Sequence, residues 1–174
     1  MLFRSEKLGL RKSAKIIVCG LDASGKTTIV NWLKPPKTKY FEITPTVGFS
    51  VEYFKLNKIN FTVFDMSGHG RYRDLWESFY ADSKGVIYVV DSSDSKRIHI
   101  AKQELFALLK HKNLEGIPII ILANKSDIKD SLDAAQISDY FDLHMIDHPF
   151  HIVETVATTG KNINQGLIWL TQRL

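Results

Sequence analysis

The segment Gly20-Leu21-Asp22-Ala23-Ser24-Gly25-Lys26-Thr27 matches the phosphate-binding pattern G-x-x-x-x-G-K-[ST]. Gly20 and Gly25 let backbone N–H groups turn toward phosphate oxygens, in conformations that a Cβ atom hinders. Lys26 offers a positive charge to the β- and γ-phosphates, and Thr27 offers a hydroxyl oxygen to Mg²⁺. The residues of this region predicted to bind the nucleotide are Gly20, Asp22, Ala23, Ser24, Gly25, Lys26, Thr27 and Thr28.

The sequence around this segment favours a nucleotide-binding α/β fold. An apolar run at 14–19 precedes it, and a predicted helix after it ends at Pro35-Pro36. Further apolar runs at 86–90 and 117–122 are typical of central parallel strands that are covered on both faces. The segments 49–55 and 59–66 are predicted to form a hairpin. The order is β-α-β-β-α-β-α-β-α-β-α, which predicts a doubly wound, six-stranded, mostly parallel sheet with one antiparallel edge strand.

Charge is concentrated at the start of the chain. The 174 residues carry 23 basic and 19 acidic side chains, and the excess of four lies within residues 1–15. Because the remainder is balanced, nucleic-acid binding gains no support. The basic positions alternate with Leu2, Phe3, Leu8 and Leu10, so residues 1–13 are either a disordered lead-in or an amphipathic segment that touches anionic lipid. Residues 14–174 are predicted to form one domain. The single cysteine, Cys19, rules out an internal disulfide and fits a cytoplasmic protein.

Two short motifs are expected to lie near the phosphates. Asp65-Met66-Ser67-Gly68 follows the predicted strand 59–66, where Asp65 can hold Mg²⁺ through water and the N–H of Gly68 can reach the γ-phosphate. Thr46 precedes the hairpin and is predicted to bind both Mg²⁺ and the γ-phosphate, so that it senses whether that phosphate is present.

A third motif predicts which base is bound. Asn124-Lys125-Ser126-Asp127 fits the pattern N-K-x-D at the end of the strand 117–123. Asp127 can accept from the N1–H and the exocyclic amine of guanine, a donor pair that adenine lacks. Lys125 can lie over the base, and Asn124 can tie the segment to the phosphate-binding loop. The segment Glu154-Thr155-Val156-Ala157 is predicted to close over the guanine with its backbone, and Glu154 and Thr155 are the site residues predicted from it.

Together these residues resemble the Arf family of Ras-type small GTPases. The segments that carry the resemblance are Gly20-Leu21-Asp22, Gly25-Lys26-Thr27-Thr28, Pro45-Thr46-Val47-Gly48-Phe49, Arg73-Asp74-Leu75-Trp76 and Val90-Asp91-Ser92-Ser93-Asp94. The resemblance implies a GTP/GDP switch that uses Mg²⁺, is a monomer, and is served by an exchange factor and a GTPase-activating protein. Within the family, Phe61–Gly68 and Gly70–Arg73 are most similar to a member that recruits a coat complex, the BBSome, to ciliary membranes.

The chain departs from the family pattern at three positions. His69 stands where members usually carry the glutamine that positions the attacking water, so the resemblance assigns this catalytic role to His69. The alternative is a recruitment module that binds GTP but hardly hydrolyses it. Leu2 replaces the glycine of the myristoylation pattern, and Glu154 replaces the usual alanine. A nucleotide kinase or ATPase, another alternative on the same loop, is disfavoured by the N-K-x-D segment.

The sequence predicts a structural role for two of the three tryptophans and leaves two roles open for the third. Trp32 and Trp169 are predicted to pack against neighbouring elements. Trp76 follows the Asp65–Gly68 motif and is predicted either to pack in the same way or to face a partner in the GTP state.

Overall fold

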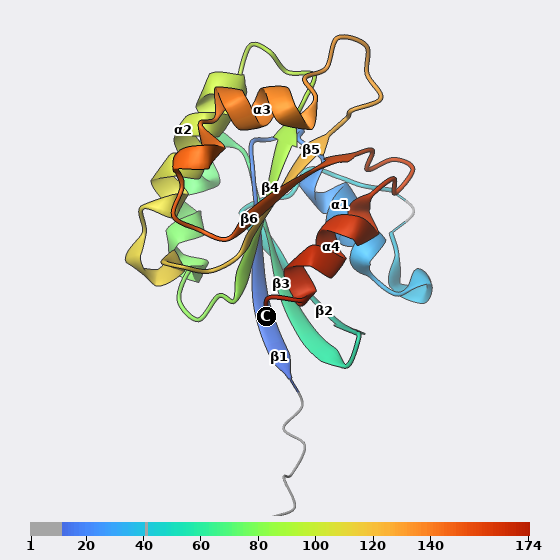
Figure 1. Cartoon of the computed structure of the whole chain (residues 1–174). Helices are drawn as coiled ribbons and strands as arrows, with labels where there is room; N and C mark the ends of the chain where they lie inside the picture. Colours follow the sequence, from blue (N-terminus) through green and yellow to red (C-terminus); the bar gives the residue numbers. More distant parts are fainter. Residues whose placement is uncertain (1–11, 41) are drawn as a thin grey trace, which may run out of the picture.

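The protein is a six-stranded sheet with helices on both faces (Figure 1). The computed structural model describes residues 12–40 and 42–174, so most of the predicted N-terminal segment 1–13 lies outside the described residues. The elements in chain order are β1 (Ser13–Cys19), α1 (Lys26–Leu33), η1 (Pro36–Thr38), β2 (Phe49–Leu56), β3 (Ile59–Met66), η2 (Gly70–Phe79), β4 (Gly85–Asp91), α2 (Ile98–Leu109), η3 (Lys112–Leu114), β5 (Ile119–Asn124), α3 (Ala134–Tyr140), η4 (Leu143–Met145), β6 (Phe150–Thr155) and α4 (Ile163–Thr171).

The strand order is β2-β3-β1-β4-β5-β6, with β2 antiparallel to β3 and every other pair parallel. This confirms the predicted doubly wound sheet with one antiparallel edge strand. The hairpin turn consists of Asn57 and Lys58, whose φ angles of 48° and 66° are both positive. A two-residue hairpin requires that conformation because it matches the twist of the two strands.

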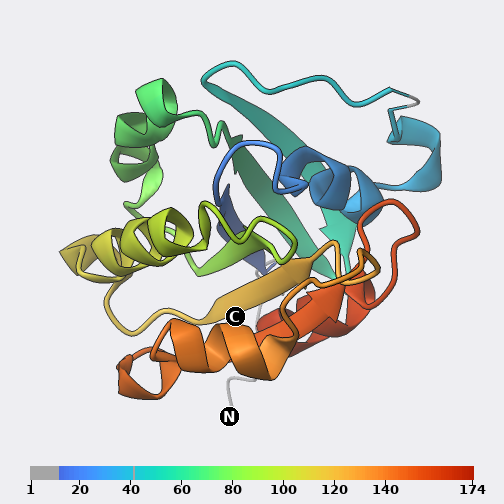
Figure 2. The same ribbon diagram turned by 90° about the horizontal axis from the view of Figure 1, so that it is seen from above.

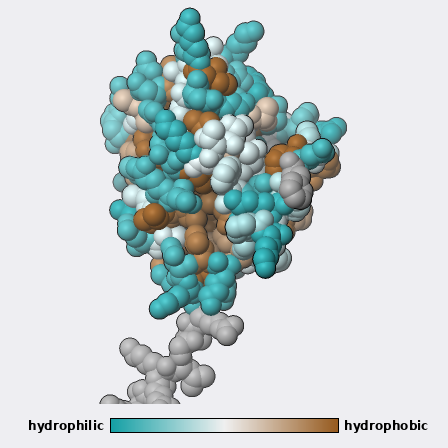
Figure 3. Space-filling model, turned by 90° about the vertical axis from the view of Figure 1, so that its right-hand side faces the viewer, coloured by the Kyte–Doolittle hydropathy of each residue, from teal (hydrophilic) through white to brown (hydrophobic). Residues whose placement is uncertain are grey.

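Two apolar cores lie on opposite faces of the sheet. Residues of α2 and α3 pack on one face, and residues of α1 and α4 pack on the other. Figure 1 shows the two helix pairs on opposite sides of the sheet. Every residue of β5 is buried, which explains its continuous apolar sequence. On the surface formed by α1 and α4, hydrophilic residues cover most of the area, with apolar residues between them (Figure 3).

The element between β3 and β4 corrects the predicted pattern, because η2 is a 3₁₀ segment instead of an α-helix. Its backbone bonds span three residues, as in Tyr72 N–H to the His69 carbonyl at 2.8 Å. The indole of Trp76 donates to the Ser67 carbonyl at 2.9 Å and is buried. Trp76 therefore packs inward and fixes η2 against the loop after β3, which settles the choice between packing and facing a partner for this conformation.

The parallel strands all end at one edge of the sheet, and the loops that follow them gather there. Figure 2 looks down on this edge, with the loop between β1 and α1 at its centre, between the two helix layers. The predicted ligand site therefore belongs at this edge. Within the described part of the chain, no helix combines the length and apolar character needed to cross a bilayer.

Candidate functional site

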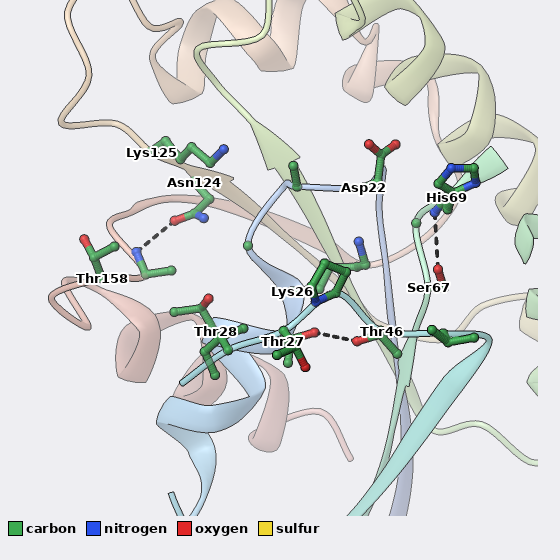
Figure 4. A pocket seen from close by; sticks show the side chains of 18 of the residues that line it. Asp22, Lys26, Thr27, Thr28, Thr46, Ser67, His69, Asn124, Lys125 and Thr158 are labelled. Carbon is green, nitrogen blue, oxygen red and sulfur yellow. Dashed lines mark hydrogen bonds between the residues drawn. The ribbon is translucent and has the colours of Figure 1, made fainter. Parts of the chain in front are cut away.

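A cavity of about 630 Å³ opens at this edge of the sheet. That volume is in the range of small-ligand sites. Of the residues predicted from sequence, those that line it are Asp22, Ala23, Gly25, Lys26, Thr27, Thr28, Thr46, Gly68, His69, Asn124, Lys125 and Asp127. Figure 4 shows Thr27 and Thr46 facing each other below Lys26, with Asn124 and Lys125 on one side of Lys26 and His69 on the other.

The loop from Gly20 to Gly25 is shaped by its two glycines. Their φ angles are 140° and 100°, both outside the range that suits residues with a Cβ. A Cβ on Gly20 would lie 2.2 Å from the Val89 carbonyl oxygen, and one on Gly25 would lie 2.3 Å from Nδ2 of Asn124. Gly20 therefore does not line the cavity itself; it lets β1 and β4 approach closely while the chain turns into α1. Ser24, in the same loop, is fully buried and does not line the cavity either.

Lys26 is the positive charge at the centre of the loop. Its ammonium group donates to the Leu21 carbonyl at 2.6 Å, which folds the side chain across the loop, and only 6% of the residue is exposed. Burial lowers the pKa of Lys26 to about 8. An anionic phosphate beside Lys26 would favour the charged ammonium and so raise its pKa again. Lys26 is also the first residue of α1, and no side chain at Gly25 caps the first N–H groups of that helix. Uncapped N–H groups at a helix N-terminus favour the binding of an anion.

Three oxygen-bearing side chains converge beside Lys26. The Thr27 hydroxyl donates to Oδ2 of Asp65 at 2.6 Å and lies 2.8 Å from the Thr46 hydroxyl, which is 3.4 Å from the same carboxylate oxygen. Asp65 is fully buried, and its second oxygen, Oδ1, has no hydrogen-bond partner among the described residues. Burial raises the pKa of Asp65, while the bond from Thr27 opposes the rise. Hydroxyl and carboxylate oxygens with a buried acceptor to spare fit Mg²⁺, which prefers oxygen ligands.

The loop after β3 brings Gly68 and His69 to the cavity. A Cβ on Gly68 would lie 2.2 Å from the backbone carbon of Leu21, so Gly68 packs directly on the phosphate-binding loop. His69 is exposed, and its backbone N–H donates to the Ser67 hydroxyl at 3.4 Å. Its ring meets the Tyr72 ring edge-on, with 6.3 Å between centroids. The imidazole is therefore free of the core, and His69 lines the cavity.

The other end of the cavity carries the N-K-x-D residues. Asn124 is buried and donates to the Ser24 carbonyl at 2.8 Å, which ties the end of β5 to the phosphate-binding loop. Lys125 has a positive φ of 63°, and its ammonium group donates to Asp91 at 2.6 Å. Asp127 is exposed at the cavity wall. A base at this end of the cavity could contact the aliphatic part of the Lys125 side chain and the carboxylate of Asp127.

The structure corrects the predicted base-closing residues. The Glu154 carboxylate accepts from the Ala134 backbone at 3.0 Å, which turns it toward α3. Thr155 is fully buried, and its hydroxyl donates to Asn124 at 3.2 Å. Neither lines the cavity, because both still belong to β6 and face its neighbours. The second half of the predicted segment, Val156 and Ala157, does line the cavity, and Thr158 lines it as well.

Sequence reasoning missed two arginines that hold Asp22. Oδ1 of Asp22 accepts from Arg97 at 2.8 Å and lies 3.9 Å from Arg73. Arg73 also donates to the Gly68 carbonyl at 2.9 Å, so it links the loop after β3 to the phosphate-binding loop. Arg97 precedes α2, and its bond to Asp22 spans 75 positions in the chain. No local pattern indicates such a pairing.

Comparison with known proteins agrees with this site. The ADP-ribosylation factor family model matches residues 2–174. ADP-ribosylation factor-like protein 6 of Danio rerio is 45% identical over 171 residues, which is 96% of this chain and 92% of the relative. The protein of that name from Caenorhabditis elegans is 41% identical over 167 residues, covering 94% of this chain and 88% of the relative.

A solved structure agrees as well. The Arl6 BBS3 small GTPase from Trypanosoma brucei, solved with the bound nucleotide analogue GppNp, superposes with a TM-score of 0.86 at 40% identity, over 92% of this chain and 96% of that one. The resemblance drawn from the sequence motifs is thereby confirmed, down to the member they match best. The chain belongs to the ADP-ribosylation factor family and is a small GTPase, a guanine-nucleotide-binding switch that hydrolyses GTP.

Proposed function

We propose that this chain is a slow GTPase that uses Mg²⁺, docks on membranes when GTP is bound, and recruits an effector coat, the BBSome, at the cilium. The observation that carries the proposal is that the loop before β2 contacts the predicted Mg²⁺ site and also presents an apolar residue to solvent. Thr46 reaches Thr27 and Asp65 inside the cavity, while Val47, the next residue, is 73% exposed. A phosphate or Mg²⁺ that holds Thr46 therefore also fixes an exposed apolar surface that continues into Phe49 of β2.

In the proposed site, Lys26 and the backbone of the phosphate-binding loop hold the β- and γ-phosphates. Thr27 and Thr46 are the proposed Mg²⁺ ligands, with Asp65 acting through water, and the metal neutralises phosphate charge when it is bound. Asp127 and Lys125 bind guanine. Arg73 and Arg97 are both engaged with Asp22. We therefore expect a GTPase-activating protein to supply the arginine that stabilises the transferred phosphoryl group.

His69→Gln is expected to raise intrinsic GTP hydrolysis by roughly tenfold, equivalent to about 1.4 kcal/mol, with little change in GTP affinity. A glutamine amide can accept from water and donate to a phosphoryl oxygen through adjacent atoms, whereas a neutral imidazole has its donor and acceptor on opposite sides. The interaction forms only as attack begins, so it acts on rate and not on binding. Single-turnover hydrolysis of γ-³²P-labelled GTP measures it.

His69→Leu is the matched comparison in that experiment. If His69→Leu and His69→Gln hydrolyse GTP equally fast, the side chain at position 69 takes no part in intrinsic hydrolysis. A wild type that outpaces His69→Gln would make histidine the better catalyst. No measurable turnover in wild type, together with tight GTP binding, would instead support the alternative of a hydrolysis-deficient recruitment module.

Membrane docking is proposed for residues 2–12, nearly all of which lie outside the described part of the chain. We expect GTP-loaded protein to sediment with vesicles that contain phosphatidylserine, and GDP-loaded protein to stay in solution. Each basic residue near an anionic leaflet contributes about 1 kcal/mol, so binding should fall as salt is raised. Deletion of residues 2–12 should abolish it. Cosedimentation that survives the deletion would show that another surface carries the contact.

Coat recruitment is tested with purified components. GTP-loaded protein should retain purified BBSome on beads, whereas the GDP-loaded form should not. Phe49→Asp, which places a charge on the exposed apolar surface at the start of β2, should abolish retention while leaving nucleotide binding intact, because Phe49 is 44% exposed and does not line the cavity. Equal retention by both nucleotide states would refute a switch-dependent role.

A further inference from the structure

The loop that bounds the base end of the cavity is held from outside by a tryptophan. Trp32 lies near the end of α1, and its indole N–H donates to the Ala157 carbonyl. Ala157 lines the cavity, and its own N–H donates to Oδ1 of Asn124 at 2.9 Å. One peptide segment is thus fixed on both sides, by Asn124 from within the site and by Trp32 from α1. Figure 1 shows the loop after β6 beside α1.

The indole ring also packs against the rest of this loop. A Cβ on Gly160 would lie 3.0 Å from ring atoms of Trp32, so the backbone there runs directly over the ring. Gly160 has a φ of 79°, and its N–H donates to the Val156 carbonyl at 2.9 Å, which closes the turn that the indole covers. The Lys39 ammonium lies 4.2 Å from the centroid of the Trp32 ring, a distance typical of a cation–π contact.

These contacts give Trp32 more than the packing role predicted from the sequence. Trp32 is 40% exposed, so it is a partly buried surface residue, and in addition to packing it directs its N–H at a backbone carbonyl of the cavity wall. Indole is a donor only, and a tryptophan at a surface typically combines an apolar body with one specific hydrogen bond. Loops at ligand sites open locally at low cost unless such contacts hold them.

We propose that Trp32 is a positioning residue that holds the loop 156–160 closed at the base end of the cavity and thereby slows release of guanine nucleotide. This inference rests on the proposed binding of guanine between Lys125 and Asp127. A base bound there can leave only when the adjoining wall moves, and that movement breaks the bond from Trp32 to Ala157. Because GDP and GTP share the base, the effect applies to both nucleotides.

The test measures release of mant-GDP, a fluorescent GDP, from the full chain after addition of excess GDP. Trp32→Phe keeps an aromatic ring but removes the N–H, and should speed release by about three- to tenfold, the range expected for one lost hydrogen bond. Trp169→Phe is the matched control. Trp169 stacks on His151, 5.6 Å between centroids, and does not line the cavity, so its replacement should leave release at the wild-type rate.

A spectroscopic signal separates positioning from general stabilisation. In the ¹⁵N-labelled, GDP-loaded chain, the indole N–H signal that Trp32→Phe removes should exchange with water more than about tenfold more slowly than a free indole. Exchange at the free rate, release from Trp32→Phe at the wild-type rate, or equal acceleration by Trp169→Phe would each overturn the inference. Failure of wild type to retain mant-GDP at all would instead refute the proposed function of the cavity.

Discussion

Lys26→Ala should weaken the binding of GTP and GDP by more than about 100-fold. The ammonium group is the buried cation at the centre of the phosphate-binding loop, and only 6% of the residue is exposed. Removing one partner of a buried charge pair costs 2–5 kcal/mol, and about 3 kcal/mol corresponds to a factor above 100. Equilibrium titration with a fluorescent guanine nucleotide in the presence of Mg²⁺ measures the loss.

The matched control for this change is Lys102→Ala. Lys102 is a lysine whose ammonium group forms an ion pair with Asp142 at 2.5 Å, and it lies outside the cavity. That variant should bind both nucleotides as wild type does. If Lys26→Ala retained affinity within threefold of wild type, the loop from Gly20 to Gly25 would not be the phosphate site.

Asp127→Asn should change which base is bound. The carboxylate accepts from two donors of guanine, whereas an amide can donate to the 2-oxo group of xanthine. Base contacts of this kind are worth roughly 1–3 kcal/mol, so GTP affinity should fall by about tenfold or more while affinity for xanthosine triphosphate rises. Displacement of a fluorescent guanine nucleotide by GTP and by xanthosine triphosphate gives the two affinities.

Asp130→Asn controls for the loss of a carboxylate from the same loop. Asp130 is exposed three positions further on and does not line the cavity. It should leave the preference for guanine unchanged. An Asp127→Asn variant that binds GTP as tightly as wild type would show that another group reads the base.

The sheet could be predicted from the sequence because the apolar patterns of its strands match the burial of those strands in the fold. β5 is buried on both faces, and such a strand requires a continuous apolar run. The phosphate-binding loop before α1 requires glycine, lysine and a hydroxyl residue at fixed spacing, which few other sequences match. Asn57 and Lys58 likewise sit at the turn where the hairpin was expected.

The errors lie where an element's end or a long-range contact decides the outcome. Of the predicted base-closing segment 154–157, Glu154 and Thr155 still belong to β6, so the residues that line the cavity begin at Val156. The bond from Trp32 to Ala157 joins residues 125 positions apart, and its existence depends on how α1 packs beside the loop after β6. Periodicity and motif spacing describe local geometry and carry no information about such pairs.

The central claim is that the cavity selects a guanine nucleotide through its N-K-x-D end. The most direct measurement is displacement of mant-GDP from the full chain by GTP and, separately, by ATP, both in the presence of Mg²⁺. GTP should displace the probe at concentrations near that of the protein, and ATP should fail even at about a thousandfold excess, because a site built to hydrogen-bond one set of donors strongly rejects a ligand that lacks them. Displacement by ATP at concentrations similar to those of GTP would contradict the claim.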